Sequence, residues 1–442
     1  MPASSSINVT ELIDHHPIGG LQMRVILLCG LVALLDGFDV LAIGLAAPAM
    51  GTALHIAPGR FGVVFSAALL GLMLGAFVLG PLADRFGRKS LLIGATLLFG
   101  IFTLCTARSG TLQQVLLFRF LAGLGLGGAM PGFISLAAEF TPRARRGLVV
   151  GLLFTGFPLG GVIVGLLGAR LIVMFGWPSL FYIGGILPLA LAPVLLLALP
   201  ESIGFLVTKQ AAPQKIRNLL ARIAPALHIP PGIRFVLTDP QLPGIGVRHL
   251  FTQGRARGTA LIWICYFVTF LILLTDATWT PTLLREAGIG TVSAALVVAA
   301  FAIGSVAGTP LGGFLVGRFT ALAVLPVLLV GSTLALGALG FVIPSLPRIM
   351  GLQALAGFLL GAASSGLIAL SASFYPLAIR STGVGWAMGL GRLGSFVGPL
   401  AIGALVAAGW LAGSIFAALS APALLAALSV ALLLPERICW RA

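Results

Sequence analysis

The chain has 442 residues, of which 59% are hydrophobic and only 8% are charged. Soluble domains carry roughly 25% charged residues, so this composition excludes an ordinary soluble fold and indicates a chain surrounded by lipid. The net charge of +15 does not indicate nucleic-acid binding, because Lys and Arg are spread over short loops instead of forming one basic face.

Apolar runs long enough to cross a bilayer recur along the whole chain. A membrane-spanning helix needs about 20 apolar residues, and the sequence predicts twelve of them, at 24–50, 61–82, 90–107, 112–138, 147–168, 177–199, 258–283, 291–316, 321–343, 348–373, 382–407 and 411–434. The first 23 residues have no basic region before an apolar core, so a cleaved signal peptide is not expected. The predicted fold class is an all-α membrane protein.

The distribution of positive charge predicts the orientation of these helices. With both termini in the cytoplasm, 19 Lys and Arg residues lie inside, 5 lie outside and 2, Arg119 and Arg392, lie within helices. Such an excess of Lys and Arg is typical of cytoplasmic loops. The isolated cysteines, Cys29, Cys105, Cys265 and Cys439, have neither disulfide nor metal-ligand spacing, so neither a metal nor a cofactor is expected.

An internal repeat relates the two halves of the chain. At an offset of 234 positions, eleven residues of 121–146 meet identical residues of 355–380 without a gap, from the pair Leu121 and Leu355 to the pair Arg146 and Arg380. Six predicted helices fall within this offset, and because six is even, both copies begin on the same side of the membrane. Parallel repeats of this kind build a midplane site between two rocking halves.

The repeat predicts three regions. An N-terminal six-helix bundle covers 1–200, a cytoplasmic central loop covers 201–257, and a C-terminal six-helix bundle covers 258–442. Within the loop, the stretch 215–227 has apolar residues on one side and is expected to lie along the membrane surface or the end of the bundle.

The loop between the second and third predicted helices carries a specific motif, G-P-L-A-D-R-F-G-R-K at 80–89. It resembles the G-x-L-x-D-R-x-G-R-K/R signature of the major facilitator superfamily. Gly87 permits a tight turn, while Asp84 could cap a helix start or pair with an arginine such as Arg146. Such a contact would hold one conformation and release in the other, so we expect a gating role.

The gating hypothesis has one alternative, and it does not extend equally to the second half of the chain. Arg85, Arg88 and Lys89 could serve only to anchor the topology of this loop. In the second copy of the repeat, Gly317 replaces the acid. Any latch in that half must therefore be weaker or use other groups.

The first predicted helix contains two acids, in the sequence L-L-D-G-F-D that ends at Asp39. A separation of three residues places Asp36 and Asp39 on one helix face, and each acid at membrane depth costs about 2.5–3.5 kcal/mol. A water-filled cavity, an arginine partner or protonation could compensate. A carboxylate that gains and loses a proton suits proton coupling; the alternative is a permanent salt bridge that only fixes helix packing.

Several motifs together narrow the resemblance to the aromatic acid:proton symporter family within that superfamily. They are D-G-F-D at 36–39, R-F-L-A-G-L-G-L-G-G-A-M-P at 119–131, W-T-P at 279–281, Y-P at 375–376 followed by Arg380, G-V-G-W at 383–386 and G-R-L-G at 391–394. The resemblance covers nearly the whole chain. It implies twelve helices in two parallel six-helix repeats and uptake of a benzoate-like or hydroxybenzoate-like carboxylate with a proton by alternating access.

The same resemblance implies functional residues. Asp36 and Asp39 match the essential acids of the first helix, and the charged residues Arg119, Glu139, Arg380 and Arg392 match positions of functional importance.

From their chemistry, Arg119 and Arg392 could each clamp a substrate carboxylate with two hydrogen bonds. They come from different halves of the chain. The alternatives are neutralisation of the two aspartates, or a position near a helix end with the charged head reaching water.

Other candidates have simpler explanations. Glu139 lies beside Pro142 and three arginines and favours a structural ion pair. Asp276 could face the cavity or be exposed near an outer helix end. Glycine-rich runs such as 123–128 lie inside apolar helices and favour close helix packing over phosphate binding. Aromatic residues that could stack on a substrate ring are Phe38, Trp263, Tyr266, Phe267 and Trp386.

Four other functions are possible for a chain of this composition. Sugar transport is disfavoured because the spans lack the amides that polyols require, although Pro200-Glu201-Ser202 resembles sugar porters. Proton-coupled efflux uses the same fold and acids and stays open. A sensor would need an output domain, and an enzyme a nucleophile–base pair or metal cluster, neither of which the sequence suggests. The expected partners are a small organic acid, protons and lipid, with the chain working as a monomer.

Overall fold

The structure is a computed structural model that describes residues 6–209, 213–224, 233–236, 247–342, 345–376 and 379–433. Within these ranges, twelve helices are long and apolar enough to cross a membrane, which confirms the predicted fold class. They are α2 (Gly20–Leu54), α3 (Phe61–Phe86), α4 (Arg88–Ala107), α5 (Leu112–Glu139), α6 (Arg143–Phe175), α7 (Pro178–Ala198), α10 (Ala256–Glu286), α11 (Thr291–Phe319), α12 (Ala321–Val342), α13 (Leu346–Phe374), α14 (Arg380–Ala407) and α15 (Ala412–Ala431).

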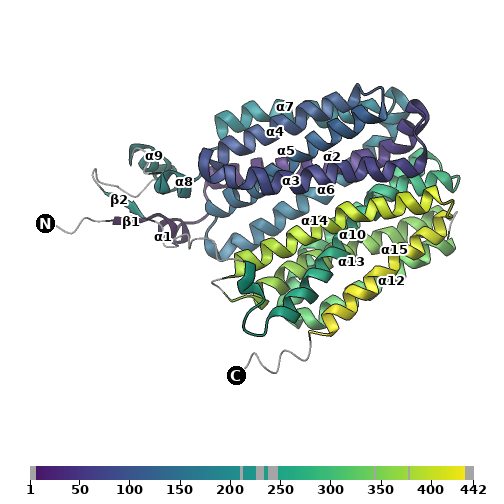
Figure 1. The fold of residues 1–442 in the computed structure, drawn as a ribbon. Coiled ribbons are helices and arrows are strands. Elements are labelled where there is room, and N and C mark those ends of the chain that lie inside the picture. Colours follow the sequence, from purple (N-terminus) through teal and green to yellow (C-terminus); the bar gives the residue numbers. More distant parts are fainter. Residues whose placement is uncertain are drawn as a thin grey trace.

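The helices form two groups that follow the order of the chain. Figure 1 shows α2 to α7 in purple and blue above α10 to α15 in green and yellow. Most predicted boundaries differ from the observed ones by only a few residues. The largest difference is in α6, predicted at 147–168 and observed at Arg143–Phe175, because intrahelical hydrogen bonds continue the helix beyond its most apolar segment.

Short elements gather at one end of the bundle, which we call the tail side; the opposite end is the closed side. The tail side carries α1 (Val9–Asp14), α8 (Ile203–Thr208) and α9 (Pro213–Ile223) (Figure 1). There β1 (Ser6–Asn8) pairs in parallel with β2 (Arg234–Val236), so the N-terminal segment is joined to the connection between the halves.

Helix α9 corresponds to the predicted amphipathic stretch 215–227. Its apolar residues are buried on one face, where they belong to one hydrophobic cluster with residues of α1 and α8: Ile216, Leu219, Leu220 and Ile223. The amphipathic prediction is therefore confirmed over the described part, while 225–227 lie outside the described residues.

Glycines bring neighbouring helices into backbone contact in both halves. A side chain at Gly123 of α5 would overlap the carbonyl of Ala68 in α3. At the equivalent position of the repeat, a side chain at Gly357 of α13 would overlap the carbonyl of Phe301 in α11. This confirms that the glycine runs serve close helix packing, and each half gains a tightly fitted helix pair.

The two halves meet directly on the closed side. A Cβ at Gly62 of α3 would lie 2.6 Å from the carbonyl oxygen of Pro399 in α14 and 3.0 Å from the Cα of Gly403. The hydroxyl of Ser66 donates a hydrogen bond of 2.7 Å to the carbonyl of Phe396 in the same helix. This seam shuts the bundle at one end.

Candidate functional site

A cavity of about 630 Å³ lies between the two halves. Its lining includes most residues between 147 and 154, in the first turns of α6, and four residues between 309 and 314, in the last turns of α11. Both segments lie toward the tail side. Because the halves touch at the other end, the cavity extends toward the tail side. Its volume falls within the range of roughly 300–1,000 Å³ that small-molecule sites occupy.

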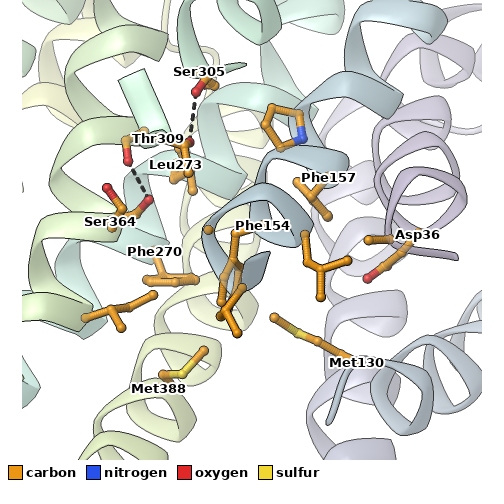
Figure 2. Close-up of a pocket in the computed structure, with 18 of the residues that line it drawn as sticks. Asp36, Met130, Phe154, Phe157, Phe270, Leu273, Ser305, Thr309, Ser364 and Met388 are labelled. Carbon is orange, nitrogen blue, oxygen red and sulfur yellow. Dashed lines mark hydrogen bonds between the residues drawn. The ribbon is translucent and has the colours of Figure 1, made fainter. Parts of the chain in front are cut away.

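Asp36 of α2 lines this cavity and is only 4% exposed. Among the described residues, its Oδ1 atom has no hydrogen-bond partner. Figure 2 shows the carboxylate at one edge of the cavity, near Met130 and Phe157. Of the three ways to compensate a buried acid, Asp36 therefore has access to the cavity and to proton exchange.

Arg392 of α14 lines the same cavity from the other half of the chain. Its Nη1 atom donates to the carbonyl of Leu72 at 3.1 Å, and its Nη2 atom lies 2.8 Å from the sulfur of Met130. Both acceptors are neutral, and a thioether is a weak acceptor. The guanidinium also attracts Asp36 electrostatically. It is therefore placed to receive an anion that enters the cavity.

Asp39 and Arg119 form a separate cluster outside the cavity lining. Both side chains are fully buried, and the guanidinium of Arg119 donates to the two carboxylate oxygens at 3.0 and 2.8 Å. The hydroxyl of Thr103 donates to the same carboxylate at 2.7 Å, and the ring of Phe181 lies 5.7 Å from the guanidinium carbon. This is the arginine partner expected for one of the acids.

The two acids of α2 thus have different environments. Positions three apart on an α-helix differ by about 60° around the axis, which is enough here to turn Asp36 to the cavity and Asp39 to α5. The hypothesis was that one or both of Arg119 and Arg392 face the cavity, and in this conformation Arg392 lines it and Arg119 does not. Arg119 is neutralised by Asp39, the alternative that its chemistry left open.

This difference makes Asp39→Asn the more destabilising of the two amide substitutions. It leaves the Arg119 guanidinium buried without a counter-charge, and removing one partner of a buried pair costs about 3–5 kcal/mol. We expect the thermal midpoint of the purified protein in detergent to fall by several degrees for Asp39→Asn and to change little for Asp36→Asn. Equal midpoints would show that the pair contributes nothing to stability.

The aromatic residues that line the cavity differ from those that the sequence predicted as contacts for a substrate ring. Phe38, Trp263, Tyr266, Phe267 and Trp386 are not among its lining residues. Trp263 instead stacks on Trp386 at 6.1 Å, and the hydroxyl of Tyr266 shares a hydrogen bond of 2.9 Å with Ser371. The rings that line the cavity are Phe133, Phe154, Phe157, Phe270, Phe301 and Phe314.

Hydroxyl groups line the cavity on the side of α11 and α13. They belong to Ser305 and Thr309 in α11 and to Ser364 and Ser365 in α13. Figure 2 shows labelled members of this group on the side of the cavity away from Asp36, with Phe154 between them in this view. These residues were not predicted, because serine and threonine in helices commonly donate to carbonyls of their own helix. Thr309, Ser364 and Ser365 do so here, and Ser305 of α11 donates to the carbonyl of Gly357 in α13.

The predicted gating motif lies in a polar cluster on the tail side. Gly87 has φ +97°, a conformation that favours glycine. A Cβ there would lie 2.5 Å from the carboxylate of Glu201, which accepts a hydrogen bond of 3.0 Å from the amide of Lys89. Glu201 was not predicted to belong to this site. The sequence Pro200-Glu201-Ser202 was noted only for its resemblance to sugar porters.

Glu139 does form an ion pair, but its partner was not among the three neighbouring arginines. Arg88 of the motif reaches Glu139 at the end of α5, and the hydroxyl of Ser202 donates to the same carboxylate at 2.5 Å. The fold brings α4 beside α5, so the motif arginine is nearer than those at the start of α6. The contact joins the motif to the segment after α7.

The other predicted gating residues make local contacts. Arg146 donates to the carbonyl of Thr141 at 3.4 Å, and Arg380 donates to the carbonyl of Tyr375 at the same distance. Arg85 lies over the ring of Phe86 at 5.4 Å. The side chain of Asp84 lies outside the described residues, so its pairing with Arg146 stays a prediction.

Asp276 of α10 is neither exposed nor part of the cavity lining. It is 1% exposed and accepts hydrogen bonds of 3.1 Å from Gln353 in α13 and Thr280 in its own helix. Both expected positions for this acid are therefore wrong, because α13 covers this face of α10.

Comparison with known proteins identifies the family to which the chain belongs. A profile described as "Major Facilitator Superfamily" matches residues 29–319 and 262–438. The chain belongs to the major facilitator superfamily, and it is a multi-pass membrane transporter.

Two relatives carry the match over nearly the whole length. The chain is 38% identical to the 4-hydroxybenzoate transporter PcaK of Pseudomonas aeruginosa over 98% of this chain and 97% of that protein. It is 36% identical to a gallate transporter of Pseudomonas putida over 97% and 95%. These relatives confirm the predicted resemblance to the aromatic acid family.

A solved structure shares the fold. The crystal structure of a D-xylose-proton symporter superimposes with a TM-score of 0.72 at 19% identity and covers 92% of this chain and 97% of its own.

Proposed function

We propose that this protein takes up an aromatic carboxylate of the hydroxybenzoate class together with a proton by alternating access. The observation that supports this most strongly is the cavity in which Asp36 and Arg392, from opposite halves, face a space lined by phenylalanine rings. A monoanionic aromatic acid needs a cation for its carboxylate and apolar surfaces for its ring.

Each part of such a substrate has a counterpart in the cavity. The carboxylate would replace the weak acceptors of Arg392 with a charge-assisted, bidentate pair. The ring would lie among Phe154, Phe157 and Phe270, where offset or edge contacts between rings add stability. Phenolic hydroxyls would reach the serines and threonine of α11 and α13.

Proton coupling follows from the position of Asp36. A proton on Asp36 would cancel its attraction for Arg392 and free the guanidinium for the substrate anion. Loss of the proton into the water of the tail side would restore that attraction and favour release of the anion. Binding of proton and substrate would thus be mutually supportive, which is the requirement for symport.

The proposal includes an orientation in the membrane. Both termini and the tail side would face the cytoplasm of a bacterial cell, with the protein in the inner membrane. Residues 1–200 and 258–442 would rock against each other, and 201–257 would form a cytoplasmic connection. Because the cavity lies within one chain, a monomer would suffice.

Counterflow in proteoliposomes tests the proposal and separates uptake of aromatic acids from efflux of other metabolites. Vesicles loaded with unlabelled 4-hydroxybenzoate should concentrate the labelled acid transiently. Gallate and benzoate should compete, whereas 4-hydroxybenzamide, which lacks the carboxylate, should not. An inward proton gradient should then drive accumulation that a protonophore abolishes. Absence of counterflow with every acid would contradict the substrate class, and accumulation only with an outward-directed proton gradient would favour efflux by proton antiport.

A further inference from the structure

The buried pair Asp276 and Gln353 is a site that the transport mechanism above does not use. Both side chains lie near the closed side, where α10 packs on α13, and they are 1% and 0% exposed. The amide nitrogen of Gln353 and the hydroxyl of Thr280 both donate to Oδ1 of Asp276 at 3.1 Å. Within the described part of the chain, Oδ2 of Asp276 and Oε1 of Gln353 have no hydrogen-bond partner.

The internal repeat explains this arrangement. The offset of 234 positions that aligns the two halves places Gln353 where the N-terminal half has Arg119. In each half, an acid of the first helix contacts this position of the fourth helix, as Asp39 contacts Arg119 and Asp276 contacts Gln353. The C-terminal half therefore retains the carboxyl group but has a neutral amide in place of the cation.

Among the residues that the structure describes, no charged group of the helices packed on α10 compensates Asp276. Among described residues, the charges of these helices and of α10 itself are either exposed or engaged elsewhere. The exposed ones are Arg24, Arg257, Arg285, Glu286, Arg318, Arg348 and Arg380, and the others are Asp36, Asp39 and Arg392. Arg24 is at the tail-side end of α2, and α15 has no charged residue. A dry carboxylate without a cation costs several kcal/mol, whereas the protonated acid does not bear that cost.

We propose that Asp276 and Gln353 form a second proton-binding site, which must hold a proton before the closed side can close. With the Gln353 amide turned over, Oε1 would take the place of Nε2 beside Oδ1 of Asp276, and a proton on Oδ1 would be donated to Oε1.

The neighbours of Asp276 connect this proton to the seam between the halves. Two residues further along α10, the backbone of Thr278 touches Gly44 of α2, and three residues further, Trp279 meets Phe65 of α3 edge-on at 5.4 Å. Separation of the halves would admit water to this stretch of α10. The O–H bond of Asp276 would then break, with the proton passing to that water and the electron pair staying on the carboxylate; closure would require the reverse. The same proton returns to the same side, so the site sets pH dependence without adding a transported proton.

Infrared spectroscopy of the purified protein in lipid tests the site without relying on transport. In an Asp36→Asn background, in which the cavity acid cannot contribute, the protein at neutral pH should show the C=O stretching band of a protonated carboxylic acid, shifted in deuterium oxide. Asp276→Asn should remove this band. Gln353→Arg, which copies the cation of the N-terminal half, should remove it as well by forming an ion pair, while Gln353→Met should retain it. Glu286→Gln, at an exposed carboxyl of the same helix, is the matched control.

Exchange of labelled 4-hydroxybenzoate tests the role in closure, and this part rests on the proposed function. As the pH on the closed side rises from acid to alkaline, wild-type exchange should slow severalfold, whereas exchange by Asp276→Asn and Gln353→Arg should slow much less, because only Asp36 still responds to that pH. A band that persists in Asp276→Asn, or a variant that follows the wild-type pH profile, would overturn the proposal. Either variant suffices if the other does not fold. Loss of exchange in all proteins with the infrared result intact would count against the substrate, not against the site.

Discussion

Asp36→Asn is expected to abolish proton-driven accumulation of substrate while leaving exchange intact. The amide keeps the size of the side chain but is permanently neutral, so it no longer switches the attraction that Arg392 feels. A pH difference of about one unit supplies about 1.4 kcal/mol per proton, or tenfold accumulation. In proteoliposomes with such a gradient, the wild-type protein should approach this ratio and the variant should reach only equal concentrations on both sides.

Counterflow separates this result from a trivial loss of protein. Because exchange needs reorientation of the loaded carrier but no net proton movement, Asp36→Asn should still exchange labelled acid. Glu286→Gln serves as the control for removal of one exposed carboxyl group. Accumulation by Asp36→Asn at the wild-type level would show that the cavity acid does not couple transport to protons.

Arg392→Lys is expected to weaken the affinity for aromatic carboxylates by about 10–100-fold. Lysine keeps the charge but loses the planar fork that binds a carboxylate through two hydrogen bonds. Hydrogen bonds to charged groups contribute about 1.5–3 kcal/mol each, so loss of one accounts for this range. Isothermal titration calorimetry with 4-hydroxybenzoate would measure the change directly.

The uncharged analogue is the internal reference for this prediction. Any weak binding of 4-hydroxybenzamide should be the same in wild-type and Arg392→Lys protein. This analogue has no carboxylate, so the substitution removes no carboxylate hydrogen bond from it. Arg318→Lys, at an exposed position at the end of α11, should leave both affinities unchanged. Unaltered carboxylate affinity in Arg392→Lys would assign this residue to contacts between the halves through Leu72 and Met130.

The helices and the repeat could be predicted from sequence because hydrophobicity over about 20 residues and glycine spacing are local properties. Asp36 could be singled out for a similar reason, since an acid within an apolar span is costly wherever its helix lies. The distinction between Asp36 and Asp39 could not be predicted. It depends on which neighbour covers each side of α2, and Arg119 reaches only one of them.

The ring residues show the same limit more clearly. Phe154 and Phe157 are ordinary apolar residues in an apolar helix, and only the packing of α6 against the other half turns them into the cavity. Trp263 and Trp386 were predicted as contacts for a substrate ring because they are large aromatic residues, yet they stack on one another. Glu201, in the segment that follows α7, contacts the gating motif from more than 100 residues away in the sequence, so the contact could not be predicted from local sequence.

The seam at Gly62 and Gly403 has a consequence for how the closed side is held shut. At these positions the backbones of α3 and α14 are in direct contact, so close backbone packing holds the two helices together where another protein could use a salt bridge. One added methyl group there would act as a spacer and favour the conformation in which the closed side is open, without touching substrate or proton. Glycine at this seam thereby permits the protein to alternate between its two orientations.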